Sequence, residues 1–474
     1  MVRSIKNLFL ENKSIKQTIF KNTFWLGISE IFTRLVGIFI VVWMARYFGP
    51  AIYGQWAFAL SFVTLFSVLA DFGFSTLTVR EIARDKSKTS QYLSNIIIMK
   101  IILGLITLGL IAIIIQLLNK EPEIVKLVYF LGIYIVINTF ANFFQYIFRA
   151  NEKMQYEAVC RVLQSIFLFG LVLFFILDEG SILTISYAYI IAALISVFFS
   201  IFLIWFYFSK FSLRINIKIC KEIFFKAWPF ALSYMAISVY YYMDTVMLGL
   251  MKSNQEVGWY NAVYRIVLFT QVAGTIIWAS FFPQLSQKYK ESLNSLKKVA
   301  NQLAEITHIF AWPVAMGGTL LASQIIVFFY GKEYLPGTLA FQILIWSIAI
   351  IYIASVYHET IKASDRQKLY LTGVGGGAVL NIILNFLFIP RWSLNGAALA
   401  TLLTEMAVMI FMYIQVNKFI NLKPFIPALI PFVSAIVMGG SIYFCFSSFN
   451  VILVIFLGGM IYFSLIAFFR FKRL

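Results

Sequence analysis

The sequence predicts an all-α integral membrane protein with about 14 transmembrane helices, and three observations support this fold class. Of the 474 residues, 61% are hydrophobic and only 12% are charged, whereas soluble domains have roughly 45–50% apolar and about 25% charged residues. Continuous apolar stretches such as 96–118 and 190–208 suit helices and lack the alternation of transmembrane β-barrel strands. A spanning helix needs about 20 apolar residues, which leaves room only for short loops.

Apolar runs between charged residues, proline or glycine define the expected spans. The first run has no small-residue cleavage site, so we expect a retained span and not a signal peptide. The spans are expected at residues 19–46, 53–79, 92–118, 125–148, 157–177, 183–208, 224–250, 257–285, 299–328, 338–360, 369–389, 395–417, 425–446 and 450–470.

The distribution of Lys and Arg predicts the orientation. The chain has a formal net charge of +18, and its bases concentrate in alternate segments between the spans. The segments expected on the other side of the membrane contain only Arg46, Lys120, Lys126, Lys252, Lys332 and Arg391. Because cytoplasmic loops are rich in Lys and Arg, both termini are expected in the cytoplasm, with the protein in the inner or plasma membrane. The charge does not indicate a nucleic-acid partner, because no soluble domain is expected to present it.

A weak internal repeat suggests two halves. Tyr53-Gly54-Gln55-Trp56 opens the second expected span, and Val257-Gly258-Trp259-Tyr260 opens the eighth. The expected organisation is an interfacial cytoplasmic segment at 1–18, a six-helix lobe at 19–208, a cytoplasmic linker at 209–223, a second six-helix lobe at 224–417, and two further helices with a basic C-terminus at 418–474. A disordered basic tail is the alternative for the first segment.

Two blocks of short motifs carry a resemblance to a known family. The first contains Ala45-Arg46-Tyr47-Phe48-Gly49-Pro50, Asp71-Phe72-Gly73 and Arg80-Glu81-Ile82-Ala83. The second contains Asn381, Asn385, Ile389-Pro390, Asn395-Gly396-Ala397-Ala398, Ala400-Thr401 and Glu405. In this order they resemble the oligosaccharide-lipid, or polysaccharide-biosynthesis (O-antigen type), flippases of the multidrug/oligosaccharidyl-lipid/polysaccharide exporter superfamily, over essentially the whole chain.

This resemblance implies a fold and a function. The fold is two pseudo-symmetric six-helix bundles plus two C-terminal helices, as in lipid II flippases and multidrug and toxin extruders. The function is alternating-access flipping of a polyprenyl-diphosphate-linked oligosaccharide from the inner to the outer leaflet, coupled to an ion or to the membrane potential. The expected partners are this glycan lipid, membrane lipids and glycan polymerase machinery, and the protein is expected to be a monomer without cofactors.

Ionisable side chains inside a span are costly unless paired or hydrated, which makes them candidate functional residues. Glu30 and Arg34 lie four residues apart on one face of the first span, and Lys100 and Arg265 lie in the third and eighth. All four are candidate substrate-binding residues; Arg34 and Arg265 are expected to hold the diphosphate, because guanidinium groups bind phosphate oxygens in pairs. The alternatives are an Arg34 satisfied structurally by Glu30 or by carbonyls, and a Lys100 that reaches back to the surface.

A second polar group suits a coupling ion. Asp244 on the seventh span, Asn381 and Asn385 on the eleventh, and Thr401 on the twelfth offer oxygen ligands to a monovalent cation such as Na⁺. The resemblance supports this site, although lipid II flippases have an additional carboxylate where this chain has Asn385. The alternative is that the Asn side chains only bridge neighbouring helices.

Two histidines offer coupling to H⁺ instead. Glu305 and His308 lie one turn apart in the ninth span, and His358 adjoins Glu359 in the tenth. These four residues form a candidate proton relay because imidazole titrates near neutral pH. Ordinary polar contacts are the alternative interpretation for both pairs.

Two other functions are weighed against the flippase. A multidrug extruder would favour an acidic, aromatic cavity for organic cations, which the basic residues inside the spans oppose. A glycan polymerase or ligase would carry a large external loop, whereas the external segments here are short. Cys160, Cys220 and Cys445 are too few for a disulfide framework or a metal site. The expectation is a secondary transporter and not an enzyme, with no metal beyond a monovalent cation.

Overall fold

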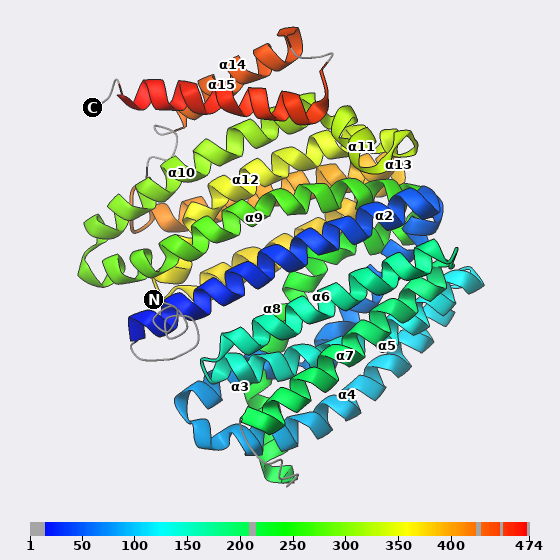
Figure 1. Ribbon diagram of the computed structural model, residues 1–474. Helices are drawn as coiled ribbons and strands as arrows, with labels where there is room; N and C mark the ends of the chain where they lie inside the picture. Colours follow the sequence, from blue (N-terminus) through cyan, green and yellow to red (C-terminus); the bar gives the residue numbers. More distant parts are fainter. Residues whose placement is uncertain (1–14, 208–214, 423–427, 446–448, 472–474) are drawn as a thin grey trace, which may run out of the picture. The chain divides into compact units, whose positions relative to one another are not determined.

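The computed structural model describes residues 15–207, 215–422, 428–445 and 449–471 (Figure 1). All regular elements in these ranges are helical, as the composition predicts. The helices are α2 (Ile15–Asp71), α3 (Phe74–Arg84), η1 (Lys86–Lys88), α4 (Thr89–Leu117), α5 (Pro122–Ala150), α6 (Met154–Leu177), α7 (Ile182–Tyr207), α8 (Ile217–Met251), α9 (Asn254–Glu291), α10 (Leu293–Leu320), α11 (Ala322–Tyr330), η2 (Lys332–Gly337), α12 (Thr338–Ala363), α13 (Gln367–Asn417), α14 (Leu429–Cys445) and α15 (Val451–Phe471). The predicted segment 1–18 lies mostly, and the predicted linker 209–223 partly, outside the described residues.

The helices are consistent with the predicted spans. Within the described ranges, 10 helices are long and apolar enough to cross a membrane, and α10 with α11, which meet at a bend of 77°, form an eleventh candidate. Two of the 10 contain a kink, in α2 at Gly49 and in α13 at Ser393, and each kink falls between two expected spans. These 11 candidates accommodate the 14 predicted spans when each of the two kinked helices is counted as two spans and the shorter apolar helix α14 is added.

Proline and left-handed backbone conformations accompany both kinks. Gly49 has φ 72° and is followed by Pro50, and Ser393 has φ 50° and follows Pro390 by three residues. Proline removes a backbone donor and clashes with the preceding turn of a helix. The breaks that the sequence predicts between these spans therefore appear as kinks in long helices.

The chain forms two compact units. Unit 1 comprises Met1–Phe48 and Gln55–Met243, and unit 2 comprises Gly49–Gly54 and Asp244–Leu474. The segment at the kink of α2 therefore belongs to unit 2, and the second division falls within α8. The predicted linker lies N-terminal to this division.

The core of unit 1 is centred on α5, which packs against α3, α4, α6 and α7. Phe143, Phe144 and Phe148 of α5 are buried together with Phe74 and Leu77 of α3. Between membrane helices, such packing stabilises mainly through van der Waals contact, because lipid tails are as apolar as the side chains.

In unit 2, α12 packs against α9, α10 and α13. The last two helices, α14 and α15, lie side by side on α10 (Figure 1). Their contact buries Met438, Ile442 and Tyr462, and the hydroxyl of Tyr462 donates to the carbonyl oxygen of Ile309 over 2.9 Å. The two C-terminal helices therefore belong to the packed core of this unit.

Gly54 and Gly258, the glycines of the two repeat motifs, both belong to unit 2, where they lie at a close backbone crossing. A Cβ added to Gly54 would collide with the carbonyl oxygen of Asn254, and one added to Gly258 would collide with that of Pro50. Only glycine permits two backbones to approach so closely, as at other small-residue crossings of membrane helices. The shared glycine of the motifs is thus explained by a direct contact between them.

Candidate functional site

A row of five charged residues, here called the charge ladder, links α2, α5 and α6 in unit 1. It consists of Glu30, Arg34, Arg149, Glu157 and Arg161. The Nε atom of Arg34 donates to Oε1 of Glu30 over 2.7 Å, as the four-residue spacing predicts. Arg161 connects this pair to Glu157, because its guanidinium lies 3.3 Å from Oε2 of Glu30 and 3.0 Å from Oε1 of Glu157. Arg149 completes the row with two hydrogen bonds to Glu157.

The ladder combines a buried carboxylate with accessible guanidinium groups. The side chain of Glu157 is completely buried, whereas those of Arg34 and Arg161 are 37% and 24% exposed. A buried carboxylate is costly unless it is paired, and the two guanidinium groups of Arg149 and Arg161 supply that pairing. Three arginines against two glutamates leave one surplus positive charge. The ladder can therefore accept a further anion at its exposed side.

Lys100 is completely buried in unit 1. Its ammonium group lies 2.8 Å from Oδ1 of Asp71 and donates to the carbonyl oxygen of Ala70 over 3.3 Å. The rings of Phe140 and Phe143 lie 5.4 and 5.8 Å from it. The alternative of a side chain that reaches the surface is wrong, and contact of Lys100 with a substrate stays a prediction.

Asp71 lies at the break between α2 and α3, where Phe72 and Gly73 have φ values of 49° and 76°. Besides Lys100, its carboxylate accepts a 2.6 Å hydrogen bond from the hydroxyl of Ser75 in the first turn of α3. The Lys100–Asp71 pair therefore ties α4 to this break, which is a structural role.

Arg265 lies on α9 in unit 2 and is half-buried. Its guanidinium interacts electrostatically with the hydroxyl groups of Tyr53 and Tyr330. Arg34 belongs to unit 1. Joint binding of one diphosphate by Arg34 and Arg265 stays a prediction.

A buried polar cluster in unit 2 contains the four predicted ion ligands and one further residue. It comprises Asp244, Tyr260, Asn381, Asn385 and Thr401. Oδ2 of Asp244 accepts hydrogen bonds from Thr401 at 2.5 Å and from Tyr260 at 2.8 Å. Nδ2 of Asn385 donates to Oδ1 of Asp244 at 2.6 Å and to Oδ1 of Asn381 at 2.9 Å. The structure thus brings together residues from α8, α9 and both halves of α13.

The chemistry of this polar cluster fits a small cation. It contains one carboxylate among neutral oxygen donors, and Oδ1 of Asn385 is buried with no hydrogen-bond partner among the described residues. A buried polar atom without a partner is unfavourable, and a bound cation or water would satisfy it. Asp244, Asn381, Asn385 and Thr401 would supply the ligands for Na⁺, with Tyr260 bonded to the carboxylate. A proton on Asp244 is the other way to neutralise the same site.

The predicted proton relay residues have separate surroundings. Glu305 is exposed, whereas His308 is buried with its ring stacked on Trp312 at a centroid distance of 6.0 Å. The ring of His358 meets that of Tyr370 at 5.7 Å. The carboxylate of Glu359 forms its ion pair with Lys362 at 2.5 Å. Relay of protons through these residues stays a prediction.

A family model described as "Polysaccharide biosynthesis protein" matches residues 19–288, which is more than half of the chain. The chain belongs to the polysaccharide biosynthesis protein family. This result agrees with the resemblance carried by the sequence motifs. The matched range contains the whole charge ladder, Lys100, Asp244 and Arg265.

Curated proteins similar to this family member include transporters and flippases. A putative O-antigen transporter of Shigella dysenteriae is 25% identical over 368 residues, which cover 74% of this chain and 88% of the relative. The lipid II flippase MurJ of Bacillus subtilis is 21% identical over 450 residues, covering 84% of this chain and 82% of the relative.

Solved structures show the same fold. Lipid II flippase MurJ in an inward closed conformation superposes with a TM-score of 0.77 at 18% identity, covering 94% of this chain and 98% of that one. An inward-facing multidrug resistance MATE family transporter gives a TM-score of 0.68 at 16% identity, with 82% and 95% covered. The family member therefore has the MurJ- and MATE-like fold that the sequence predicts.

Sequence reasoning missed four residues of the charge ladder and the polar cluster: Arg149, Glu157, Arg161 and Tyr260. The criterion that selected Arg34, an ionisable residue inside an expected span, also applies to Glu157 and Arg161 within 157–177. Tyr260 belongs to the repeat motif that opens the eighth span. The sequence shows the position of Tyr260 in that motif but does not show its hydrogen bond to Asp244.

Proposed function

We propose that this protein is a flippase that moves a polyprenyl-diphosphate-linked oligosaccharide from the inner to the outer leaflet by alternating access. The observation that carries the proposal is the charge ladder, which holds a surplus positive charge at an accessible position inside a strongly apolar helical protein. Membership of the polysaccharide biosynthesis family supports it, as do relatives named as an O-antigen transporter and a lipid II flippase.

The physical reason lies in the headgroup of such a lipid. A diphosphate cannot enter the hydrocarbon region of a membrane without compensating charge, because isolated ions are strongly disfavoured there. Arginine suits this task, since its planar fork forms paired hydrogen bonds with phosphate oxygens and keeps its proton. Arg34 and Arg161 present such groups while Glu30 and Glu157 hold them in position.

The polar cluster around Asp244 is proposed to couple transport to Na⁺ or H⁺. A buried carboxylate with neutral oxygen neighbours changes its charge balance when a cation or a proton binds, and this change can bias a conformational equilibrium. Both termini are proposed to lie in the cytoplasm, which follows from the concentration of Lys and Arg in alternate segments.

Reconstituted flipping tests the function. A fluorescent polyprenyl-diphosphate glycan is placed in the inner leaflet of proteoliposomes, and its arrival in the outer leaflet is measured by quenching, with and without a Na⁺ or H⁺ gradient. We expect protein-dependent movement that one gradient accelerates. No movement, together with efflux of cationic dyes, would instead support the multidrug extruder.

The ladder is tested in the same assay. Arg161→Ala and Arg34→Ala are expected to slow movement of the glycan lipid, because each removes a phosphate-binding group. Arg84→Ala is the matched control, since this arginine is 72% exposed at the end of α3. Equal flipping by all three variants would refute the assignment of the ladder to the substrate.

A further inference from the structure

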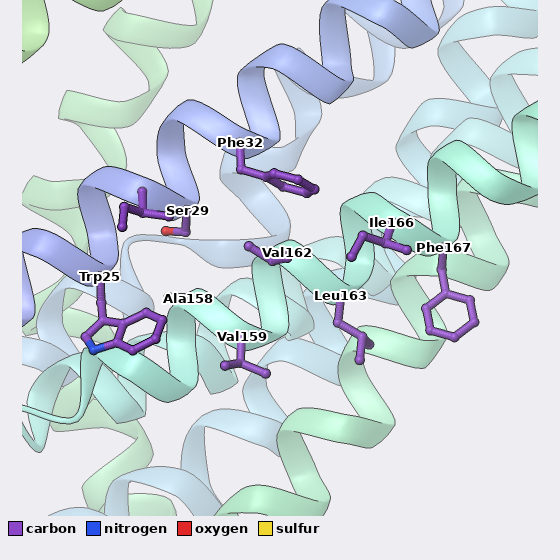
Figure 2. Close-up of a pocket in the computed structure, with 10 residues that line it drawn as sticks. Trp25, Ser29, Phe32, Ala158, Val159, Val162, Leu163, Ile166 and Phe167 are labelled. Carbon is purple, nitrogen blue, oxygen red and sulfur yellow. The ribbon is translucent and has the colours of Figure 1, made fainter. Parts of the chain in front are cut away.

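An apolar groove of about 450 Å³ lies between the N-terminal part of α2 and the first half of α6, both in unit 1. Residues between Trp25 and Phe32 line it on α2, and residues between Ala158 and Phe167 line it on α6. Figure 2 shows Trp25 and Phe32 extending from α2 on the side where α6 lies. The volume falls within the range of about 300–1,000 Å³ that is typical of ligand sites.

The groove is open and presents no free polar group. Val159, Ile166 and Phe167 are 41%, 53% and 44% exposed. Ser29 is the one polar residue in the lining, and its hydroxyl donates to the carbonyl oxygen of Leu26 over 3.0 Å. A hollow of this kind between two membrane helices has the shape and the apolar lining to hold an apolar chain.

The charge ladder lies at the same level of the same two helices. Glu30 follows Ser29 on α2, and Arg161 lies between Ala158 and Val162 on α6, so the Glu30–Arg161 ion pair links the two helices beside the groove. Farther along, the rings of Trp43 and Phe169 link them again, with centroids 6.2 Å apart. An apolar site and an accessible cationic site are therefore adjacent.

The guanidinium group of Arg161 is partly exposed, and one of its three nitrogen atoms is unpaired within the described part of the chain. The Nε atom of Arg161 is buried with no hydrogen-bond partner among the described residues. Its guanidinium group bonds Glu30 and Glu157 through the two terminal nitrogens. The surplus positive charge of the ladder and its partly exposed guanidinium groups favour a ligand with an anionic phosphate group.

We propose that the groove binds the first isoprene units of a prenyl diphosphate, with the diphosphate on Arg161 and Arg34. This inference rests on the proposed flippase function and adds the place where the lipid part of the substrate is held. In a prenyl diphosphate the anion is bonded directly to the first carbon of the chain, so the two binding sites must adjoin. A zwitterionic phospholipid has no net charge to match the ladder.

Photolabelling tests this site. The probe is farnesyl diphosphate with a diazirine near the end of its chain, applied to the purified full-length protein, and the labelled peptides are mapped by mass spectrometry. We expect adducts in 25–32 and 158–167 that excess farnesyl diphosphate suppresses and that farnesol or phosphatidylglycerol does not. Adducts confined to other peptides, or equal competition by phosphatidylglycerol, would overturn the proposal.

Variants that fill the groove with a larger side chain test the site in a second way. Val159→Trp is expected to lower labelling about tenfold by occupying the apolar volume, and Ile166→Trp serves as a second variant at an exposed lining position. Leu105→Trp on α4, where Leu105 is 66% exposed outside the groove, is expected to label like the wild type. Unchanged labelling of both groove variants, with normal elution on size exclusion, would refute the site.

Flipping measured on the same wild-type preparation separates this inference from the proposed function. Flipping without groove labelling would overturn the inference and leave the flippase intact. Groove labelling without flipping would overturn the flippase and leave a prenyl diphosphate site.

Discussion

The buried pair between Lys100 and Asp71 yields a sharp prediction, because its two members differ in their surroundings. The side chain of Lys100 is completely buried, whereas that of Asp71 is 20% exposed. Asp71 also keeps a hydrogen bond from Ser75 when the lysine is removed. Asp71→Asn leaves a buried ammonium group without its counter-charge. Lys100→Met leaves a carboxylate that keeps the hydrogen bond from Ser75 and is partly exposed.

The expected magnitudes follow from this asymmetry. Removing one partner of a buried ion pair costs about 3–5 kcal/mol when the remaining charge has no compensation, which is the expected loss of unfolding free energy for Asp71→Asn. For Lys100→Met we expect about 1–3 kcal/mol, the cost of a polar group that loses only part of its bonding. The double variant Asp71→Asn/Lys100→Met should recover much of the loss of Asp71→Asn, because no unpaired charge remains.

The assay is reversible unfolding in mixed detergent and denaturant, followed by the fluorescence of the native tryptophans. Asp71→Asn should be the least stable of the three variants. If Lys100→Met is equally destabilised, or if the double variant is no more stable than Asp71→Asn, the pair does not stabilise the α2–α3 break as argued. Impaired flipping by a normally stable Lys100→Met would instead support the predicted role of this lysine in substrate binding.

Three further predictions follow from the described contacts. Asp244→Asn is expected to abolish acceleration of flipping by an ion gradient, because it removes the only carboxylate among the five residues of the polar cluster. Gly258→Ala is expected to lower the free energy of unfolding by about 1–3 kcal/mol, the usual cost of overpacking, because the new methyl group meets the Pro50 backbone. Unfolding in detergent and denaturant measures this loss. Glu157→Gln is expected to cost about 1–3 kcal/mol in the same measurement, because the two guanidinium groups that lose this carboxylate are partly exposed and Arg161 keeps its pair with Glu30.

Each of these predictions has a control in the same chain. Asp178→Asn, at an exposed turn, should leave gradient acceleration intact. Gly375→Ala should not destabilise, because an added Cβ there meets nothing within 4 Å. Glu222→Gln breaks a surface pair whose carboxylate is 59% exposed, so its cost should be at most about 1 kcal/mol. Equal effects of a variant and its control would contradict the corresponding argument.

Much of the fold follows from hydropathy, because each membrane helix satisfies its own backbone hydrogen bonds and can be identified from its own residues. The Glu30–Arg34 pair was predictable for the same reason, since residues four apart adjoin on one helix. The kinks at Gly49 and Ser393 lie where proline and glycine interrupt the apolar pattern. The oxygen-bearing side chains expected inside the spans, together with the family resemblance, also grouped Asp244 with Asn381, Asn385 and Thr401.

Partners that lie far apart along the chain were decided only by tertiary packing. Arg161 reaches Glu30 across 131 positions, Lys100 reaches Asp71 across 29, and Thr401 reaches Asp244 across 157. Hydropathy identifies each of these residues as a costly charge or polar group in a span but carries no information about which helix lies opposite. By itself the sequence determined a many-helix membrane protein and the residues that need partners. The packing of the helices decided which residues those partners are, because the distances between side chains on different helices depend on how the helices cross and on their rotation about their own axes.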